Sequence, residues 1–361
     1  MMNYHSVKIT LLLKNFLVLL LFCFALTTQA ATDCNSVTEI PQAECETLLA
    51  LYQQTDGANW KNNKGWQQTA TPCDWYGITC DDFLGRVIDI DLSYNRLKGQ
   101  LPDLSALTEL GFLILTGNHL TGGLLGNHLP EYLEIIDIGD NTLSGPLPDL
   151  SQHPFLYILD YSHNQFTGPI NASYFPDTIE EIYLDQNQLT GPLPNLTALT
   201  YLMTFSATDN QLQGNLSRTY FPETLEGLYL NHNQLTGPLP ELTHLTALNY
   251  LELSNNQFTG ALPTFPPHLA SLNLGHNQLT GEVDLNYVTQ LHTLKLEHNQ
   301  LSGPFPQLTA LAHLGILDLS FNHFHGDIPF SLLTLSKKLI KLKIEHNHLT
   351  TFNHTLIDFL T

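Results

Sequence analysis

The sequence is short of charged residues, and of basic residues above all. Charged side chains make up 13% of its 361 residues, roughly half the share found in an ordinary soluble protein. Lys and Arg number 13 against 34 Asp and Glu, so the formal net charge is −21. Nucleic acids and anionic membranes are bound through clustered Lys and Arg. The charge balance therefore argues against DNA, RNA or a membrane surface as a partner.

Long hydrophobic runs are also scarce, and the main one lies at the start of the chain. Lys8 and Lys14 precede the apolar run 16–26, and the small residues Thr28 and Ala30 follow it at the −3 and −1 positions of a cleavage site. This order predicts a secretory signal peptide over residues 1–30. The run is shorter than the ~20 apolar residues of a membrane span. We expect an exported mature chain without a membrane span, either secreted or periplasmic.

Cysteine is limited to five residues, and Cys23 falls inside the predicted signal peptide. The other four are Cys34, Cys45, Cys73 and Cys80, an even number in a chain destined for an oxidising compartment. Three pairings are open, and Cys34 with Cys45 and Cys73 with Cys80 is the simplest because it closes short loops. The alternative is a zinc site, although the spacings lack the C-x2-C pairs of structural zinc sites.

The sequence lacks the common catalytic and nucleotide-binding motifs. It contains no G-x-S-x-G, no H-E-x-x-H and no P-loop, so we expect neither an enzyme nor a bound cofactor. Seventeen histidines are present, many of them beside a recurring Asn. We expect the five that directly precede such an Asn, His163, His232, His276, His298 and His346, to be solvated side chains along a sheet edge. The alternatives are pH sensing and metal capture by His323 with His325 or by His346 with His348.

The dominant feature is an internal repeat. From residue 87 a block L-x-x-L-x-L is followed by x-x-N-x-L, and seven successive Asn intervals are 23 residues, with 21, 22, 23 and 25 after them. Residues 164–209 also align with 210–255 over 46 positions. A fixed period of this length indicates a solenoid, in which each unit adds one strand to a parallel sheet. The recurring residues are Asn95, Asn118, Asn141, Asn164, Asn187, Asn210, Asn233, Asn256, Asn277, Asn299, Asn322 and Asn347.

These asparagines have a structural explanation. The chain must turn inward after each strand, and an amide both donates and accepts hydrogen bonds, so it can pair backbone groups of its own and the adjacent coil. We therefore predict a ladder of structural Asn side chains. Glycine stands four residues after each of the first eleven, from Gly99 to Gly326, as expected for a tight coil with positive φ.

The full pattern L-x-x-L-x-L-x-x-N-x-L-x-G-x-L-P-x-L resembles the plant-type leucine-rich repeat of receptor-like kinases, receptor-like proteins and polygalacturonase inhibitors. Trp60, Trp66 and the segment 72–81 are similar to the cysteine-paired N-terminal cap of that class. The sequence of this cap is most similar to that of secreted bacterial members. The resemblance implies an α/β-type solenoid: a horseshoe with a parallel β-sheet on its concave face, an irregular or 3-10 convex side and a helical N-terminal cap. Residues 40–52 are predicted to form the helix of this cap.

The expected domains are the signal peptide 1–30, a disulfide-bonded cap 31–86, about twelve repeats over 87–350 and a C-terminal end 351–361. The resemblance implies an exported, non-enzymatic recognition module that binds a protein or peptide on the concave face. The alternative is a carbohydrate, cell-wall or wall-enzyme ligand, as for an inhibitor. A hydrolase hidden in the array is a third hypothesis.

Charge indicates where such a ligand would bind. Residues 99–294 contain 19 Asp and Glu and one basic residue, Arg218. Parallel stacking brings the outward positions of successive strands onto one concave surface. Carboxylates beside tyrosines suit a basic partner, although an acidic surface can also serve solubility alone. The predicted binding residues are Asp137, Asp140, Asp160, Glu181, Tyr183, Asp185, Tyr229 and Glu252.

Overall fold

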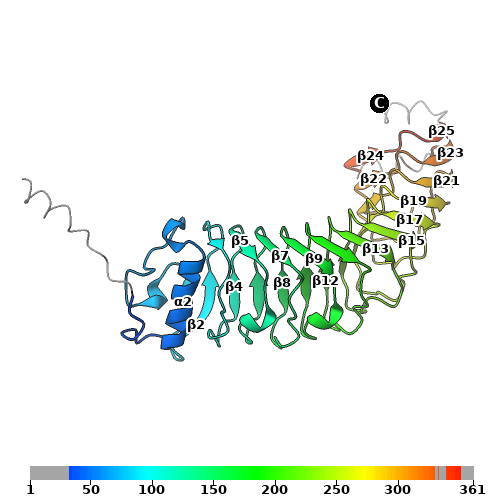
Figure 1. Ribbon diagram of the computed structural model, residues 1–361. Coiled ribbons are helices and arrows are strands. Elements are labelled where there is room, and N and C mark those ends of the chain that lie inside the picture. Colours follow the sequence, from blue (N-terminus) through cyan, green and yellow to red (C-terminus); the bar gives the residue numbers. More distant parts are fainter. Residues whose placement is uncertain (1–31, 330–331, 333–338, 351–361) are drawn as a thin grey trace, which may run out of the picture.

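The computed structural model describes residues 32–329, 332 and 339–350 (Figure 1). The predicted signal peptide and the C-terminal end 351–361 lie outside the described residues. Within them the chain coils as a curved solenoid, and each turn contributes one strand to each of two sheets. Figure 1 places β22 and β24 on the inner side of the bend and β23 and β25 on the outer side.

The main sheet has 13 strands. Twelve of them run parallel in chain order, and β1 joins the first of them, β2, in antiparallel pairing. The strands are β1 Ile78–Asp81, β2 Arg86–Asp91, β4 Phe112–Ile114, β6 Ile135–Asp137, β8 Ile158–Asp160, β10 Glu181–Tyr183, β12 Thr204–Ser206, β14 Gly227–Tyr229, β16 Tyr250–Glu252, β18 Ser271–Asn273, β20 Thr293–Lys295, β22 Ile316–Asp318 and β24 Lys341–Lys343.

A second parallel sheet of 12 strands forms just after the Asn of each turn. The repeat pattern did not predict it, because its short segments alternate around a single buried Leu or Phe. Its strands are β3 Lys98–Gly99, β5 His119–Gly122, β7 Thr142–Gly145, β9 Gln165–Pro169, β11 Gln188–Gly191, β13 Gln211–Asn215, β15 Gln234–Pro238, β17 Gln257–Gly260, β19 Gln278–Gly281, β21 Gln300–Pro304, β23 His323–Asp327 and β25 His348–Thr350.

One continuous hydrophobic core fills the coil. Leu228 and Leu230 are fully buried, whereas Tyr229 between them points outward and is half-buried. The same alternation recurs in every turn because successive side chains of a strand point to opposite faces. A single turn exposes the apolar sides of its coil, so only stacking against neighbouring turns removes them from water.

The recurring asparagines join successive turns. From Asn118 to Asn347, each Nδ2 donates to a carbonyl of its own turn and to one of the preceding turn, and each Oδ1 accepts a backbone N–H of the preceding turn. Asn95 makes the equivalent bonds to Asn62 of the N-terminal region. We call this set the Asn ladder.

The residue before each ladder Asn adopts the left-handed conformation, and so does the Gly that stands four residues after each of the first eleven. His232 has φ 53° and Gly237 has φ 78°. The first position turns the chain between the main strand and the second-sheet strand, and the Gly is the last or the penultimate residue of the second-sheet strand. A left-handed φ is costly for most residues but accessible to Asn, Asp, His and Gly. These four types hold nine of the twelve positions before a ladder Asn, and Tyr94, Gln186 and Phe321 are the exceptions.

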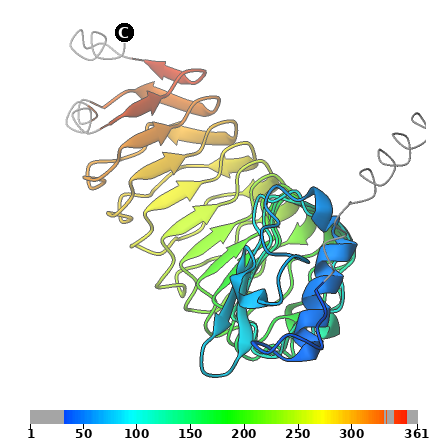
Figure 2. The same cartoon turned by 90° about the vertical axis from the view of Figure 1, so that its left-hand side faces the viewer.

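The N-terminal end of the coil is covered by the helix α2, Gln42–Gln54 (Figure 2). Two short 3-10 helices follow, η1 Gly57–Asn59 and η2 Pro72–Asp74, and two more occur in the array, η3 Gly126–His128 and η4 Ala172–Tyr174. The predicted helix over 40–52 and both predicted disulfides, Cys34–Cys45 and Cys73–Cys80, are confirmed.

Aromatic side chains and one buried ion pair fasten this region to the first turn of the array. Trp60 and Trp75 each lie 4.9 Å from the ring of Trp66, which is fully buried. The Glu44 carboxylate is fully buried and accepts hydrogen bonds from Arg86 and from the backbone N–H of Val87, both 2.9 Å long. The described residues contain no helix with the length and apolar character needed to cross a bilayer.

Candidate recognition surface

The main sheet brings the predicted acidic and aromatic residues onto adjacent strands. Parallel pairing places the outward residue of each strand directly beside its counterpart in the next, with a separation of about 4.8 Å. We call the resulting row the concave column. It runs, in strand order, through Asp137, Asp160, Tyr183, Ser206, Tyr229, Glu252 and Asn273.

The concave column contains both prominent and recessed side chains. Ser206 is 5% exposed and Asn273 is 9% exposed, so these small residues form a floor. Tyr229 lies above that floor and stacks on Tyr250 of the next strand with ring centroids 6.5 Å apart. Tyr250 is 47% exposed. The pair therefore presents a flat aromatic surface, and Tyr250 is an exposed residue of this surface that was not predicted from the sequence.

Two of the predicted residues form an internal hydrogen bond. The Tyr183 hydroxyl donates to Oε2 of Glu181 at 2.7 Å. Burial, followed by this hydrogen bond, raises the pKa of Tyr183. The phenol therefore stays protonated at physiological pH and its ring is held in a fixed orientation. A fixed aromatic loses little conformational entropy when a ligand packs against it.

Asp185 is committed to structural hydrogen bonds. Its Oδ1 accepts from the Ser206 hydroxyl at 2.5 Å and from the backbone N–H of Thr208 at 2.6 Å. Burial raises its pKa, and these bonds oppose the rise. Asp185 therefore supports the floor of the concave column, and its contribution to binding would come through its charge.

The remaining carboxylates accept hydrogen bonds from their own turn or from the adjacent strand. Asp160 accepts from the backbone N–H of Ser162 at 2.8 Å, and Glu252 accepts from the Ser271 hydroxyl at 2.8 Å. Burial raises the pKa of Asp137, with a smaller contribution from the neighbouring Asp160. In the described part of the chain, Asp137, Asp160 and Glu252 form no ion pair with Lys, Arg or His. Their negative charges are thus available to a cationic ligand.

Asp140 lies apart from the other predicted residues. It was expected at an outward strand position, but it follows the end of β6 in the left-handed turn, with φ 48°. Its exposed carboxylate is 3.6 Å from Nδ1 of His163, which occupies the same turn position one unit later. Asp140 therefore belongs to the rim of the sheet, because the chain has already turned before the ladder Asn.

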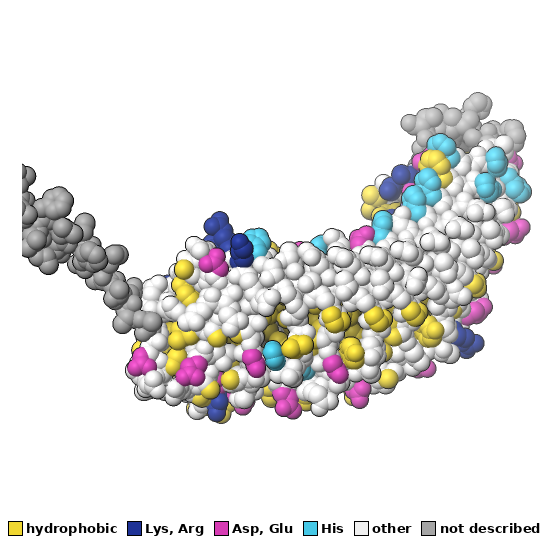
Figure 3. All heavy atoms as spheres, viewed as in Figure 1, with side chains coloured by type: hydrophobic (Ala, Val, Ile, Leu, Met, Phe, Trp, Pro, Cys, Tyr) yellow, Lys and Arg dark blue, Asp and Glu magenta, His cyan; other side chains and the backbone are white. Residues whose placement is uncertain are grey.

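The rim carries a stack of rings in its C-terminal part. Ring centroids are 4.2 Å apart between His276 and His298, 4.0 Å between His298 and Phe321 and 4.0 Å between Phe321 and His346. Figure 3 shows His side chains gathered in this part of the molecule. Burial, followed by the charge of His298, lowers the pKa of His276. The histidines of this stack were predicted from their position before a ladder Asn, whereas Phe321, which occupies the same position, was not.

One histidine from each of the two pairs considered for metal capture stacks on the other. The rings of His323 and His348 lie parallel with centroids 6.2 Å apart. No group of three or more His, Cys, Asp or Glu side chains within the described ranges is arranged to hold a metal ion. The four cysteines considered for zinc are paired as disulfides instead.

Comparison with known proteins gives the repeat a name. The profile described as "Leucine rich repeat N-terminal domain" matches residues 41–81, and leucine-rich repeat profiles match 224–245, 247–269 and 265–282. The solved structure of PEPR1–AtPEP1 is 31% identical, with a TM-score of 0.69 over 85% of this chain and 49% of that chain. The fold is a leucine-rich repeat horseshoe.

Other leucine-rich repeat proteins share this architecture. A TDR receptor structure is 26% identical, with a TM-score of 0.62 over 75% of this chain and 53% of that chain. Receptor-like protein 47 of Arabidopsis thaliana is 38% identical over 60 residues, which is 16% of this chain and 8% of that protein. The chain therefore spans about half of the PEPR1 structure and less than a tenth of this curated relative.

Proposed function

We propose that the protein is an exported, non-enzymatic recognition module that binds a basic peptide or protein segment along the concave column. The observation that carries this proposal is the row formed by Asp137, Asp160, Tyr183, Tyr229 and Glu252, in which unpaired carboxylates flank half-exposed tyrosines. An extended cationic ligand would meet carboxylates at both ends of this row and tyrosines in its middle. The acidic field would also accelerate its encounter.

The fold supports this proposal by analogy. The HAESA ectodomain, 24% identical with a TM-score of 0.52, is solved in complex with a peptide hormone ligand. Function is determined by a site rather than by a fold, so the analogy adds only that such a horseshoe can present a peptide-binding face. Two disulfides in the N-terminal region fit the export that we propose, since disulfides persist in oxidising compartments.

The test is a binding screen of the chain without residues 1–30 against two immobilised sets: random peptides of graded net charge and neutral or acidic glycans. We expect the retained peptides to be enriched in Lys and Arg, and we expect their affinity to fall as NaCl is raised. Retention of glycans in place of peptides would favour the carbohydrate alternative.

Substitutions then locate the site. Tyr229→Ala and Tyr183→Ala should each weaken a selected peptide by about tenfold or more, as truncation of a central aromatic contact does. Asp160→Asn should weaken it and reduce its salt dependence. Pro238→Ala, on the second sheet, is the matched control and should leave affinity unchanged. Salt-independent binding that survives all three concave substitutions would show that recognition lies elsewhere.

A further inference from the structure

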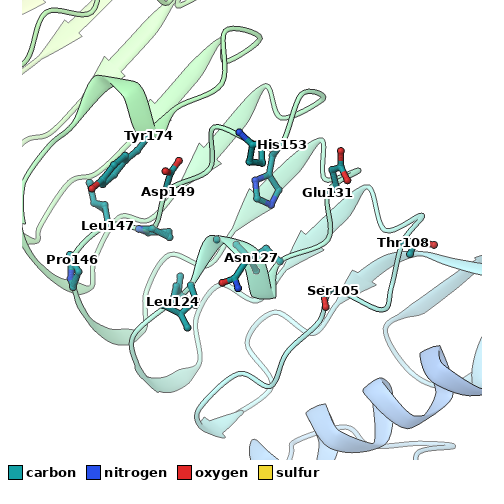
Figure 4. A pocket seen from close by; sticks show the side chains of 15 residues that line it. Ser105, Thr108, Leu124, Asn127, Glu131, Pro146, Leu147, Asp149, His153 and Tyr174 are labelled. Atoms are coloured by element: carbon teal, nitrogen blue, oxygen red, sulfur yellow. The ribbon is translucent and has the colours of Figure 1, made fainter.

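A pocket on the outer side of the coil stands apart from the concave column. It has a volume of about 760 Å³, within the range of small-molecule sites. Its walls come from the segments that connect second-sheet strands to main-sheet strands in four successive turns. Figure 4 shows the side chains of Leu124, Leu147 and Tyr174 on one side of this pocket and those of Glu131 and His153 on the other.

His153 breaks the repeat at the wall of this pocket. The equivalent position in other turns is held by Leu107, Leu199, Leu245 and Leu311, each of which is fully buried or nearly so. In all five turns the backbone N–H of this residue donates to the carbonyl three residues earlier, at 2.9 to 3.0 Å. The local backbone is therefore the same, and in this turn an imidazole replaces the aliphatic side chain of a core position.

The buried imidazole has one free nitrogen. His153 is 3% exposed, and its Nδ1 lies 3.2 Å from the carbonyl oxygen of Leu150. A carbonyl can only accept, so Nδ1 carries the proton and Nε2 of the neutral ring is an acceptor. That Nε2 is buried and has no hydrogen-bond partner among the described residues. A buried polar atom without a partner is destabilising, whereas the aliphatic residue of the other turns would carry no such cost.

The remaining lining defines the ligand chemistry. Two carboxylates, Asp149 and Glu131, line the same pocket, and none of its lining residues is Lys or Arg. Asp149 accepts from the backbone N–H of Ser151 at 3.0 Å through Oδ1. All three groups would accept hydrogen bonds from a cationic donor. Leu124, Leu129 and Leu147 supply an apolar surface beside them.

We propose that this pocket binds a small primary amine with an apolar body, whose ammonium group donates to Nε2 of His153 and is neutralised by Asp149 and Glu131. The apolar body packs against the leucines and Tyr174. This site is separate from the concave column, and neither proposal depends on the other.

The probe is phenethylamine, titrated into the chain without residues 1–30 by isothermal calorimetry and by ligand-observed NMR. We expect saturable binding with one site. Phenethyl alcohol, which lacks the charge, should bind at least tenfold more weakly, and phenylacetate should not bind. Absence of saturable phenethylamine binding, or equal binding of phenylacetate, would overturn the proposal and leave a water molecule as the partner of Nε2.

His153→Leu is the decisive variant because it restores the residue type of the other turns. We expect at least tenfold weaker phenethylamine binding together with an unchanged or higher thermal midpoint, so that a loss of binding cannot be attributed to unfolding. His244→Leu, the same replacement outside this pocket, is the control and should bind as the parent does. Unchanged binding by His153→Leu would refute the assignment.

A second variant tests the role of charge without changing a buried residue. Asp149→Asn retains the acceptor for Ser151 but removes one charge from the pocket wall. It should weaken phenethylamine by severalfold and leave phenethyl alcohol unaffected. Equal weakening of both probes would show that the charge plays no part and would also count against the proposed amine.

Discussion

The Asn ladder makes a quantitative prediction at Asn187. Its Nδ2 donates to the carbonyls of Tyr161 and Leu184 at 2.9 and 3.1 Å, and its Oδ1 accepts the backbone N–H of Phe166 at 2.9 Å. Replacement by Ala removes these three bonds and a fourth, from Nδ2 to the Asp185 carbonyl at 3.2 Å, but it does not leave every partner unpaired. The Asp185 carbonyl keeps a bond from the backbone N–H of His163 at 2.7 Å. Tyr161 keeps a bond from Asn164 at 3.3 Å, and the Leu184 carbonyl keeps one from Asn210 at 2.9 Å.

The cost of Asn187→Ala is therefore set by one orphaned donor, the buried N–H of Phe166. Leaving a buried backbone donor unpaired costs about 1–3 kcal/mol. Because each turn contacts only its neighbours, the loss should be concentrated in the turns on either side of residue 187. Binding on the concave column should not change, since the Asn side chain points into the coil.

Hydrogen exchange measured by mass spectrometry is the appropriate assay, because long arrays need not unfold in one step. Peptides covering Phe166 and Leu184 should exchange roughly five- to a hundredfold faster in Asn187→Ala, at about 1.4 kcal/mol per tenfold change. Gln188→Ala is the control, since the Gln188 side chain is exposed and makes no hydrogen bond to the described residues. Equal exchange in the parent and in Asn187→Ala would refute the ladder as a source of stability.

Two further predictions follow from the described contacts. Replacing Cys73 and Cys80 by Ser should cost about 2–5 kcal/mol, with accelerated exchange confined to the N-terminal region and the first turns; uniform loss of protection across the array would contradict nearest-neighbour coupling. The lowered pKa of His276 means that the unfolded chain binds its proton more readily than the folded chain. The contribution of His276 to the free energy of unfolding is therefore fully present above about pH 6.5, the pKa of an unfolded histidine. It is lost as the pH falls from there through the lower pKa of His276 in the folded chain. Protection factors in β18 and β20, which are corrected for the intrinsic exchange rate at each pH, should fall from pH 7.5 to pH 5.5, and His276→Phe should reduce that fall.

The main sheet could be predicted because its signal is periodic. The interval between ladder asparagines fixed the register of residues such as Asp160 and Tyr183, whose adjacency in the sheet follows from equal spacing alone. The disulfides were predictable for a similar reason, since export and four remaining cysteines left few pairings. Each of these predictions depends on a spacing that every turn obeys.

Residues that depart from the repeat were harder to predict from the sequence. Asp140 was assigned by sign of charge to the concave surface, although its position next to Asn141 places it in the left-handed turn. His153 could have been found by aligning it with Leu199 and Leu245, but its unpaired Nε2 depends on the packing of the connecting segments. The stacking of Phe321 between His298 and His346 could be recognised only from the positions of the rings. The sequence shows that the three residues share a turn position, but it does not give the distances between their rings.

The Asn ladder has a consequence for how such a chain can change its length in evolution. Asn164 and Asn210 make equivalent bonds to the turns that precede them. Excising residues 164–209 would place Asn210 where Asn164 had been, facing the same Ile138 carbonyl and Leu143 N–H. Whole pairs of turns can thus be gained or lost by unequal recombination with the ladder bonds restored at the junction.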